Sequence, residues 1–327
     1  MSNSKAPGSI SAFTFGDPVP VLDHREIGGY FHSAFNGSFY EPPVSFDGLA
    51  RALLANPHHQ SAVALKVQKL AAAYRPHPLL SRTDCKRLVQ DFVVFGNAWL
   101  ERIDNVFGKP LTLRPTLARY TRQRPDGRAV LLVDGVEHVF APEATLHLCE
   151  PDVSQEVYGR PSYEAALQSA FLNEAATLFR RKYYVNGSHA GFILYMTDPA
   201  QTQEDVDTLR DALKNAKGPG NFRNLFLYSP NGKKDGLQVI PISEVMAKDE
   251  FLNMKNVTRD DLLAAHRVPP QLLGIVPSNA GGFGDIEKAS RVWAALELGP
   301  LGEALADPIN RWLGEKVVLF EGLVSGS

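Results

Sequence analysis

A glycine-rich segment in the last third of the chain is the first candidate for chemistry. It reads GIVPSNAGGFGDIEKAS from Gly274 to Ser290, and four glycines fall between Gly274 and Gly284. Glycine-rich loops that open a helix often bind phosphate through backbone N–H groups. A Walker loop also needs a lysine after its last glycine, because the lysine reaches the β- and γ-phosphates. Asp285 stands there instead, and a carboxylate repels phosphate.

The other patterns that could support chemistry are weaker still. A dinucleotide-binding fingerprint needs a strand before its glycines, whereas a predicted helix and two prolines precede these. His58 and His59 are adjacent and cannot both face one ion from a helix. His147 and Cys149 alternate on a predicted strand, but no third ligand is indicated, so they are interpreted as core residues. The residues therefore predict no catalytic site, no metal and no cofactor.

Composition narrows the class of protein. The chain has 327 residues, 44% hydrophobic and 21% charged, which is typical of a globular protein with two domains or one elongated body. The chain has no run of about 18 apolar residues, so no transmembrane helix is expected. The N-terminus lacks a signal-peptide pattern. Cys85 and Cys149 are far apart, so we expect no disulfide framework and synthesis in a reducing compartment.

The charge balance bears on nucleic-acid binding. The formal net charge is −2. Proteins that hold DNA by releasing counterions usually carry a strong basic excess. Any contact of this chain with DNA is therefore expected to be local and weak.

The elements that would position the glycine-rich segment begin after a long aromatic arm. Residues 1–48 contain six Phe, two Tyr and many turn residues. They are interpreted either as an extended arm that packs its aromatic side chains onto another surface or as a partly disordered tail. Helices are expected from about residue 46 to 74 and again after an N-cap at Ser81 or Thr83, where apolar residues recur at helical spacing.

Strands are expected in the middle of the first half. After Gly96 the sequence favours short strands, up to the stretch TLHLCE that ends at Glu150. Two dipeptides typical of tight hairpin turns lie among them: Asp126-Gly127 and Asp134-Gly135. The first half is therefore predicted to be α+β, with antiparallel strands.

The second half predicts two long helices around a small αβ unit. The first helix is expected after an N-cap at Ser162 and ends at Asn186-Gly187, with basic residues in its last turn. A compact unit of three strands and one helix follows, up to Pro241. A second long helix is expected after Ser243 and ends before two prolines. Asp285 is then predicted to cap a further helix.

Four stretches in this half carry a family resemblance. They lie between Tyr158 and about Val317, a region that covers about half of the chain. They read ATLFRRKYYVNGSHAGFILYMTD, KGPGNFRNLFLYSPNGKKDG, KDEFLNMKNVTRDDLLAAHRVPPQLLGIVP and GGFGDIEKAS. They resemble the portal proteins of tailed bacteriophages, specifically the PBSX-type portal family of contractile-tailed temperate phages.

The resemblance implies a ring at one capsid vertex, usually of twelve subunits. Double-stranded DNA would be packaged and later ejected through its tunnel, without sequence specificity. Further implied partners are the terminase large subunit, the major capsid and scaffold proteins, and a head–tail adaptor or tail completion protein. The ring would also nucleate capsid assembly. The resemblance implies no enzymatic activity, no cofactor and no membrane, with the protein in the virion and, during assembly, in the host cytoplasm.

The same resemblance implies a portal layout for the chain. Its parts would be the wing with the N-terminal arm at 1–161, the first stem helix at 162–187, the clip at 188–242, the second stem helix at 243–273, the tunnel loop at 274–284, and a C-terminal helix with a reduced crown at 285–327.

In this layout the glycine-rich segment is a tunnel loop. Such a loop must bend sharply and approach DNA closely, which glycine permits, and the absence of fixed charge before Asp285 suits DNA that slides past. A plain linker between two helices is the alternative. The residues that would meet DNA are Ser278, Asn279, Gly281, Gly282, Phe283 and Gly284.

Two sets of basic residues are further candidates. Lys248, Lys255 and Arg259 share one face of the second long helix. They would either line the tunnel or pair with acids of a neighbouring subunit such as Glu164 or Glu174, and pairing is slightly favoured. A second set would form the partner surface of the clip: Lys214, Lys217, Arg223, Lys233 and Lys234. Competing functions are another ring-forming head–tail connector protein and a nucleotide-driven packaging enzyme.

Overall fold

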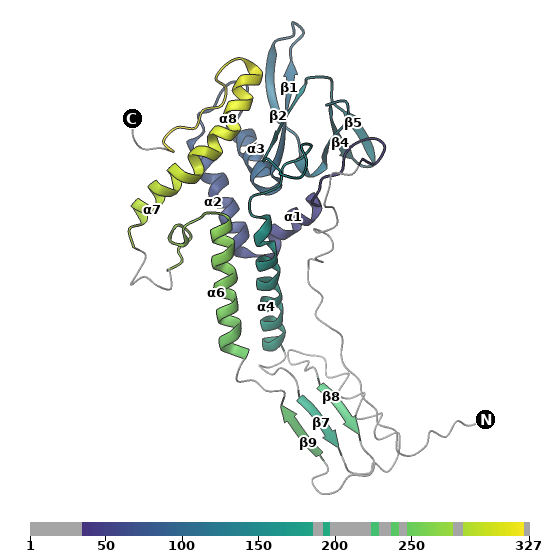
Figure 1. The fold of residues 1–327 in the computed structure, drawn as a ribbon, viewed down its shortest axis with the longest axis vertical. Helices are drawn as coiled ribbons and strands as arrows, with labels where there is room; N and C mark the ends of the chain where they lie inside the picture. Colours follow the sequence, from purple (N-terminus) through teal and green to yellow (C-terminus); the bar gives the residue numbers. More distant parts are fainter. Residues whose placement is uncertain are drawn as a thin grey trace, which may run out of the picture. The chain divides into compact units, whose positions relative to one another are not determined.

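The computed structural model describes residues 35–185, 192–196, 224–228, 237–241, 247–276 and 284–323. The chain divides into two compact units (Figure 1). The larger unit takes the described residues up to Leu172 and those from Val257 onward. The smaller unit takes those between Asn173 and Asn256. Helices and strands occur in both, so the predicted α+β class is confirmed.

Three helices open the larger unit. They are α1 (Phe46–Ala55), α2 (Pro57–Ala73) and α3 (Arg82–Phe95). Each begins at a side chain that accepts a hydrogen bond from a backbone N–H group of the first turn, which stabilises the helix start. Ser45, Asn56 and Ser81 are these caps. Ser81 therefore confirms one of the two predicted cap positions, and Gly96 ends α3 with a φ of 65°.

Two three-stranded antiparallel sheets follow. One has the order β2 (Pro110–Pro115), β1 (Asn97–Asp104), β6 (Thr145–Cys149). The other has the order β3 (Thr121–Gln123), β4 (Ala129–Val133), β5 (Val136–Val139), and a 3₁₀ turn, η2 (Ala118–Tyr120), precedes it. Both predicted hairpin turns lie in this second sheet, and Asp134 and Gly135 have φ values of 50° and 77°. Positive φ at both positions is the geometry of the predicted tight hairpin.

The core lies between the first sheet and the three helices. Its largest buried side chains are aromatic, and Trp99 on β1 is fully buried. The indole ring of Trp99 stacks on His147 of β6, with ring centroids 4.2 Å apart. Tyr163 is buried as well and donates a hydrogen bond from its hydroxyl to the carbonyl of Val94. Aromatic side chains bury more apolar surface per residue than other side chains, so they contribute most to the stability of this core.

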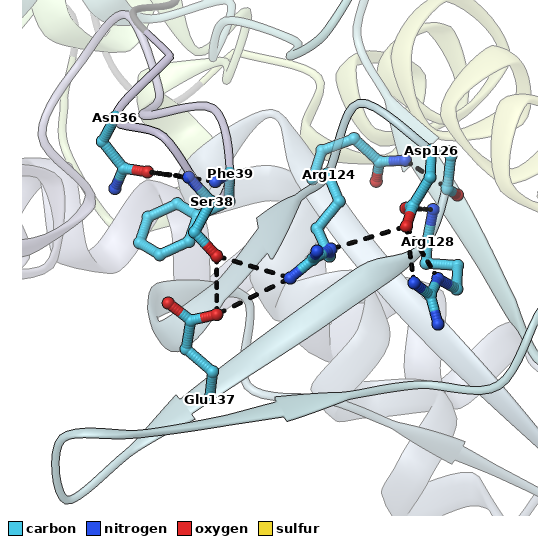
Figure 2. A network of polar contacts seen from close by, with 9 residues as sticks. Asn36, Ser38, Phe39, Arg124, Asp126, Arg128 and Glu137 are labelled. Carbon is cyan, nitrogen blue, oxygen red and sulfur yellow. Dashed lines mark hydrogen bonds and ion pairs between the residues drawn. The ribbon is translucent and has the colours of Figure 1, made fainter.

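The first described residues of the chain join the edge of the second sheet (Figure 2). Tyr40 N donates to Gln123 O on β3 over 2.8 Å. Ser38 Oγ lies 2.6 Å from Glu137 Oε2 on β5, and Arg124 Nη1 lies 3.6 Å from the same carboxylate oxygen. Phe39 is buried beside this network. The predicted arm therefore packs at least this aromatic residue onto its own chain, whereas residues 1–34 lie outside the described part.

Two long helices leave and re-enter the larger unit. These are α4 (Leu167–Val185) and α6 (Ala247–Ala265), and Figure 1 shows them side by side. The predicted N-cap at Ser162 is wrong. A 3₁₀ turn, η3 (Glu164–Ala166), precedes α4, and the Glu164 carboxylate pairs with Arg160. The predicted cap of the second helix, Ser243, lies outside the described residues.

The smaller unit contains a third sheet. Its order is β8 (Asn224–Tyr228), β7 (Phe192–Met196), β9 (Leu237–Pro241). The three predicted strands are confirmed, and β7 is central, parallel to β8 and antiparallel to β9. Parallel neighbours need a long crossover connection rather than a hairpin.

The C-terminal part of the larger unit is helical. A 3₁₀ turn, η4 (Pro270–Leu273), follows α6. Then come α7 (Ile286–Trp293), a π-helical turn η5 (Ala294–Leu298) and α8 (Gly299–Leu313). The Asp285 side chain accepts from Lys288 N over 2.8 Å, so the predicted cap is confirmed. Among the described helices, none combines the length and the apolar character needed to cross a bilayer.

Candidate functional site

The contact between α4 and α6 is the feature that bears most directly on the predicted pair of long helices. Its apolar seam is narrow and consists of Ala170 of α4, Leu262 of α6 and Ala166 of the preceding η3 turn, with Ala265 packed against them. Small side chains allow two helix backbones to approach closely, but they bury little area per residue. Leu172 and Val257 remain 47% and 60% exposed on the same two helices.

Polar contacts continue this seam in both units. In the larger unit, Ser169 Oγ donates to Asp261 Oδ2 over 2.9 Å. In the smaller unit, Asn173 Nδ2 donates to the carbonyl of Lys255 over 3.2 Å. Within each unit, side-chain hydrogen bonds to a specific partner therefore define the alignment of the two helices, because small apolar residues alone specify that alignment poorly.

The structure places two of the three predicted basic residues of α6. Lys255 Nζ donates to Thr177 Oγ1 of α4 over 3.0 Å. Burial, followed by the nearby charge of Arg180, lowers the pKa of Lys255. Arg259 Nη2 lies 2.8 Å from Asp260 Oδ1. Each therefore contacts a group of its own chain, while the side chain of Lys248 lies outside the described part.

Both ends of the glycine-rich segment are described. Gly274 ends η4 with a φ of 72°, and its N–H group donates to Gln271 O over 3.1 Å. Gly284 has a φ of 64° and precedes the Asp285 cap. Positive φ at both positions explains why glycine stands there. The remaining predicted tunnel-loop residues, 278–283, lie outside the described part, as do the five predicted clip residues from Lys214 to Lys234.

The histidines considered as ligands have protein partners. His147 Nε2 lies 2.9 Å from Asn97 Oδ1, and burial lowers the pKa of His147 to about 3. His59 Nδ1 lies 2.8 Å from His266 Nε2 in a buried contact, and burial lowers their pKa values to about 4 and about 2. Among the described residues, no group of three His, Cys, Asp or Glu side chains has the spacing of a metal site. Both cysteines are free, with Cys85 buried and Cys149 exposed.

The sequence did not indicate an ionic cluster in which a lysine and a glutamate are buried and an arginine is largely exposed. Lys66 on α2, Arg267 after α6 and Glu297 in η5 meet beside a cavity of about 270 Å³ that Glu150 also lines. Lys66 lies 231 positions from Glu297 in the sequence, and Arg267 lies 30 positions from it. Arg267 has an unusual φ of 53°, but a φ value cannot be read from a sequence, so this feature could not have pointed to the cluster.

Three comparisons place the chain among known proteins. A family model described as phage portal protein matches residues 64–323. The chain is 50% identical over 314 residues to a probable portal protein of Escherichia phage P2, covering 95% of this chain and 91% of that protein. It is 38% identical over 299 residues to a probable portal protein of Haemophilus phage HP1, covering 89% and 86%.

A solved structure shares the fold. It is the neck of a native gene transfer agent particle computed with C12 symmetry, and the TM-score is 0.62 at 20% sequence identity. The match covers 90% of this chain and 88% of that one.

Proposed function

Because this chain belongs to the phage portal protein family, we propose that twelve copies form a ring around a central tunnel for double-stranded DNA. The observation that carries the proposal is the family match over residues 64–323, together with 50% identity to a phage portal protein along nearly the whole chain. The fold match to a particle neck computed with C12 symmetry supports the ring and its number of subunits.

Family membership confirms three of the expectations from the sequence. The resemblance to phage portal proteins is correct. The protein is a structural component and not an enzyme, so the competing interpretation as a nucleotide-driven packaging enzyme is set aside. Its place is the phage particle, at the connection between head and tail.

Within the proposed ring, α4 and α6 are the two stem helices. Their narrow seam and their mutual hydrogen bonds hold each pair together. Their exposed apolar residues, Leu172 and Val257, would be covered by the stems of neighbouring subunits. A ring closes through such head-to-tail contacts, in which one surface of a subunit meets a different surface of the next.

The remaining parts follow the portal layout. Residues 1–161 form the wing, residues 188–242 the clip, residues 274–284 the tunnel loop and residues 285–327 the C-terminal helix with a reduced crown. The strands β7, β8 and β9 support a compact clip. Positive φ at Gly274 and Gly284 supports a sharply bent segment between η4 and α7.

The proposed partners act at different parts of the ring. The clip, with its lysines and arginine, would contact the terminase large subunit during packaging and a head–tail adaptor or tail completion protein afterwards. The ring would contact the major capsid and scaffold proteins and nucleate assembly of the head. DNA would pass without sequence-specific contacts, and the net charge of −2 is in keeping with weak contacts to its phosphates. Lys248, Lys255 and Arg259 of the second stem helix would either line the tunnel or pair with acids of a neighbouring subunit, and pairing is slightly favoured.

Native mass spectrometry and electron-microscopy class averages of the purified full-length protein test the ring. We expect a twelve-subunit particle with an open channel of roughly 20 Å or more, wide enough for duplex DNA. A monomer or a closed dimer at micromolar concentration would overturn the proposal. Adding the terminase large subunit tests the clip, and a complex that survives charge reversal at Lys233 and Lys234 would contradict the clip surface.

A further inference from the structure

The helix that follows the glycine-rich segment is interrupted by a π-helical turn. Residues 286–313 form one helical run, in which η5 separates α7 from α8. A π turn holds one residue more than an α turn and often marks a functional position inside a helix. The residue of this turn that faces inward with a charge is Glu297, whose side chain is 8% exposed.

Two cations from two other elements hold the Glu297 carboxylate. Lys66 Nζ of α2 lies 2.5 Å from Oε1, and Arg267 Nη1 lies 3.1 Å from Oε2. The Lys66 side chain is only 3% exposed, whereas that of Arg267 is 68% exposed and closes the pair from the solvent side. A buried ammonium group is tolerated in a protein when a paired carboxylate compensates for its lost hydration. The carboxylate is thus bonded through both oxygens, and its position relative to α2 and to the end of α6 is defined.

Arg267 occupies a backbone position that usually belongs to glycine. Its N–H group donates to Ala264 O, and Val268 N donates to Leu263 O, both over 2.9 Å. These two bonds are the pattern of a Schellman motif, whose residue after the C-cap adopts positive φ and is most often glycine. Arg267 has a φ of 53° there. A side chain kept at a strained position indicates a role for that side chain, and its ion pair with Glu297 supplies one.

The same ion pair joins the two elements that flank the glycine-rich segment. Arg267 lies two residues after the end of α6, and Glu297 lies in η5, which follows α7. The contact therefore joins two residues that are 30 positions apart in the sequence. We propose that Lys66, Glu297 and Arg267, which we name the π-turn clamp, hold η5 in its π register and thereby position α7 relative to α6. This rests on the proposed function insofar as α7 supports the tunnel loop. The clamp residues are positioning residues and do not contact DNA.

The consequence of releasing the clamp follows from helix geometry. Conversion of the π turn to an α turn removes one residue from the turn and rotates α7 about its axis by roughly 100° relative to α8. Trp293, which is 4% exposed, would leave its buried position, and Val292, which is 49% exposed, would change its surroundings. Loss of the Trp293 packing would leave α7 less firmly held, so its amides would exchange faster. Faster exchange confined to this helix is the expected signature, because a loss of global stability speeds exchange throughout the core.

Arg267→Gly is the sharpest test, because it removes the cation while relieving the backbone strain. Hydrogen–deuterium exchange of the full-length protein is measured by peptide. We expect peptides within 286–298 to exchange about two- to fivefold faster, since the lost ion pair belongs to a largely exposed arginine side chain and is correspondingly weak, while the fold is kept. Arg267→Lys keeps the charge and is expected to stay near the wild-type rate. Asp134→Gly is the matched control, because it also relieves a positive φ, at 50°, but lies in the β4–β5 turn.

A double variant keeps the proposal testable if a single change at the buried pair prevents folding. Lys66→Met with Glu297→Leu replaces the pair by apolar side chains of similar volume, which buried ion pairs often tolerate. It should show the same faster exchange in 286–298. Wild-type exchange there in both the double variant and Arg267→Gly would overturn the clamp.

Native mass spectrometry of the same samples separates the clamp from the ring. A missing ring in the wild-type protein refutes the proposed function and leaves the exchange result to decide the clamp. An intact ring with unchanged exchange refutes the clamp alone.

Discussion

Two regions of the larger unit are built on opposite principles. The core between the first sheet and α1 to α3 is aromatic and closed, with Trp99 fully buried against His147. The seam between α4 and α6 consists of alanines, one leucine and a few hydrogen bonds. The core stabilises the subunit by itself, because apolar burial is the main favourable term in folding. The helix pair leaves Leu172 and Val257 exposed and is completed, in the proposed ring, by its neighbours.

Removing the central aromatic residue of the core should have the largest effect. Trp99→Ala creates a cavity under β1 and removes the stacking on His147, so we expect a loss of about 3–5 kcal/mol in the free energy of unfolding. Urea denaturation followed by circular dichroism measures it. A loss below about 1 kcal/mol would mean that the core does not carry the stability assigned to it.

Acid should weaken the core through its buried histidines. His59, His147 and His266 have folded pKa values of about 4, 3 and 2, below the value near 6.5 of an unfolded chain. The unfolded state therefore binds more protons as the pH falls below 6.5, and stability falls with it. Asp91 acts in the opposite direction, because burial raises its folded pKa to about 7 and its protonation stabilises the folded state at lower pH.

The net change can be measured between pH 6.5 and pH 5. Three histidines outweigh one aspartate, so we expect a loss of about 3 kcal/mol in unfolding free energy, an order-of-magnitude figure from about 1.4 kcal/mol per net proton and pH unit. Urea midpoints at the two pH values measure it. His147→Gln should reduce the slope, and an unchanged slope in that variant would contradict the assignment.

Overpacking the seam should cost less than opening the core. Ala170 is fully buried between the two helices, and Ala170→Leu forces them apart at a cost of about 1–3 kcal/mol. Ala175→Leu is the matched control, because Ala175 is exposed on the same helix. Thermal unfolding of both variants tests the contrast, and equal melting temperatures would show that the seam is not closely packed.

A charge on the exposed flank of the seam should have the smallest effect on the subunit. Val257→Glu is expected to change the free energy of unfolding by no more than about 0.5 kcal/mol, because the side chain is already solvated. Ring assembly should nevertheless be lost, since the glutamate would be buried between neighbouring stems. Val136→Glu, at a similarly exposed position on β5, is the control. A normal ring from Val257→Glu would show that this flank is not an interface.

Local patterns explain which predictions succeeded. Asp285 and Ser81 cap helices because a short polar side chain needs only the next turn of its own backbone. Asp134-Gly135 forms a tight hairpin for the same local reason. The Ser162 cap failed because the chain enters α4 through a 3₁₀ turn and the Glu164 N–H group donates to Pro161 O over 3.0 Å. A backbone carbonyl thus accepts from the first-turn N–H group that the sequence pattern assigned to the Ser162 side chain.

The sequence by itself determined the family, the α+β class and most of the helix and strand positions, because long motifs, caps and turn residues act over a few neighbouring positions. Only the tertiary structure decided what distant residues share. It placed Gly159 so close to Gly96 that a Cβ atom would lie 2.2 Å from a backbone oxygen. It also joined the buried Lys66–Glu297 pair to the largely exposed Arg267. No local pattern encodes such contacts, because they arise when separate elements pack together and exclude water.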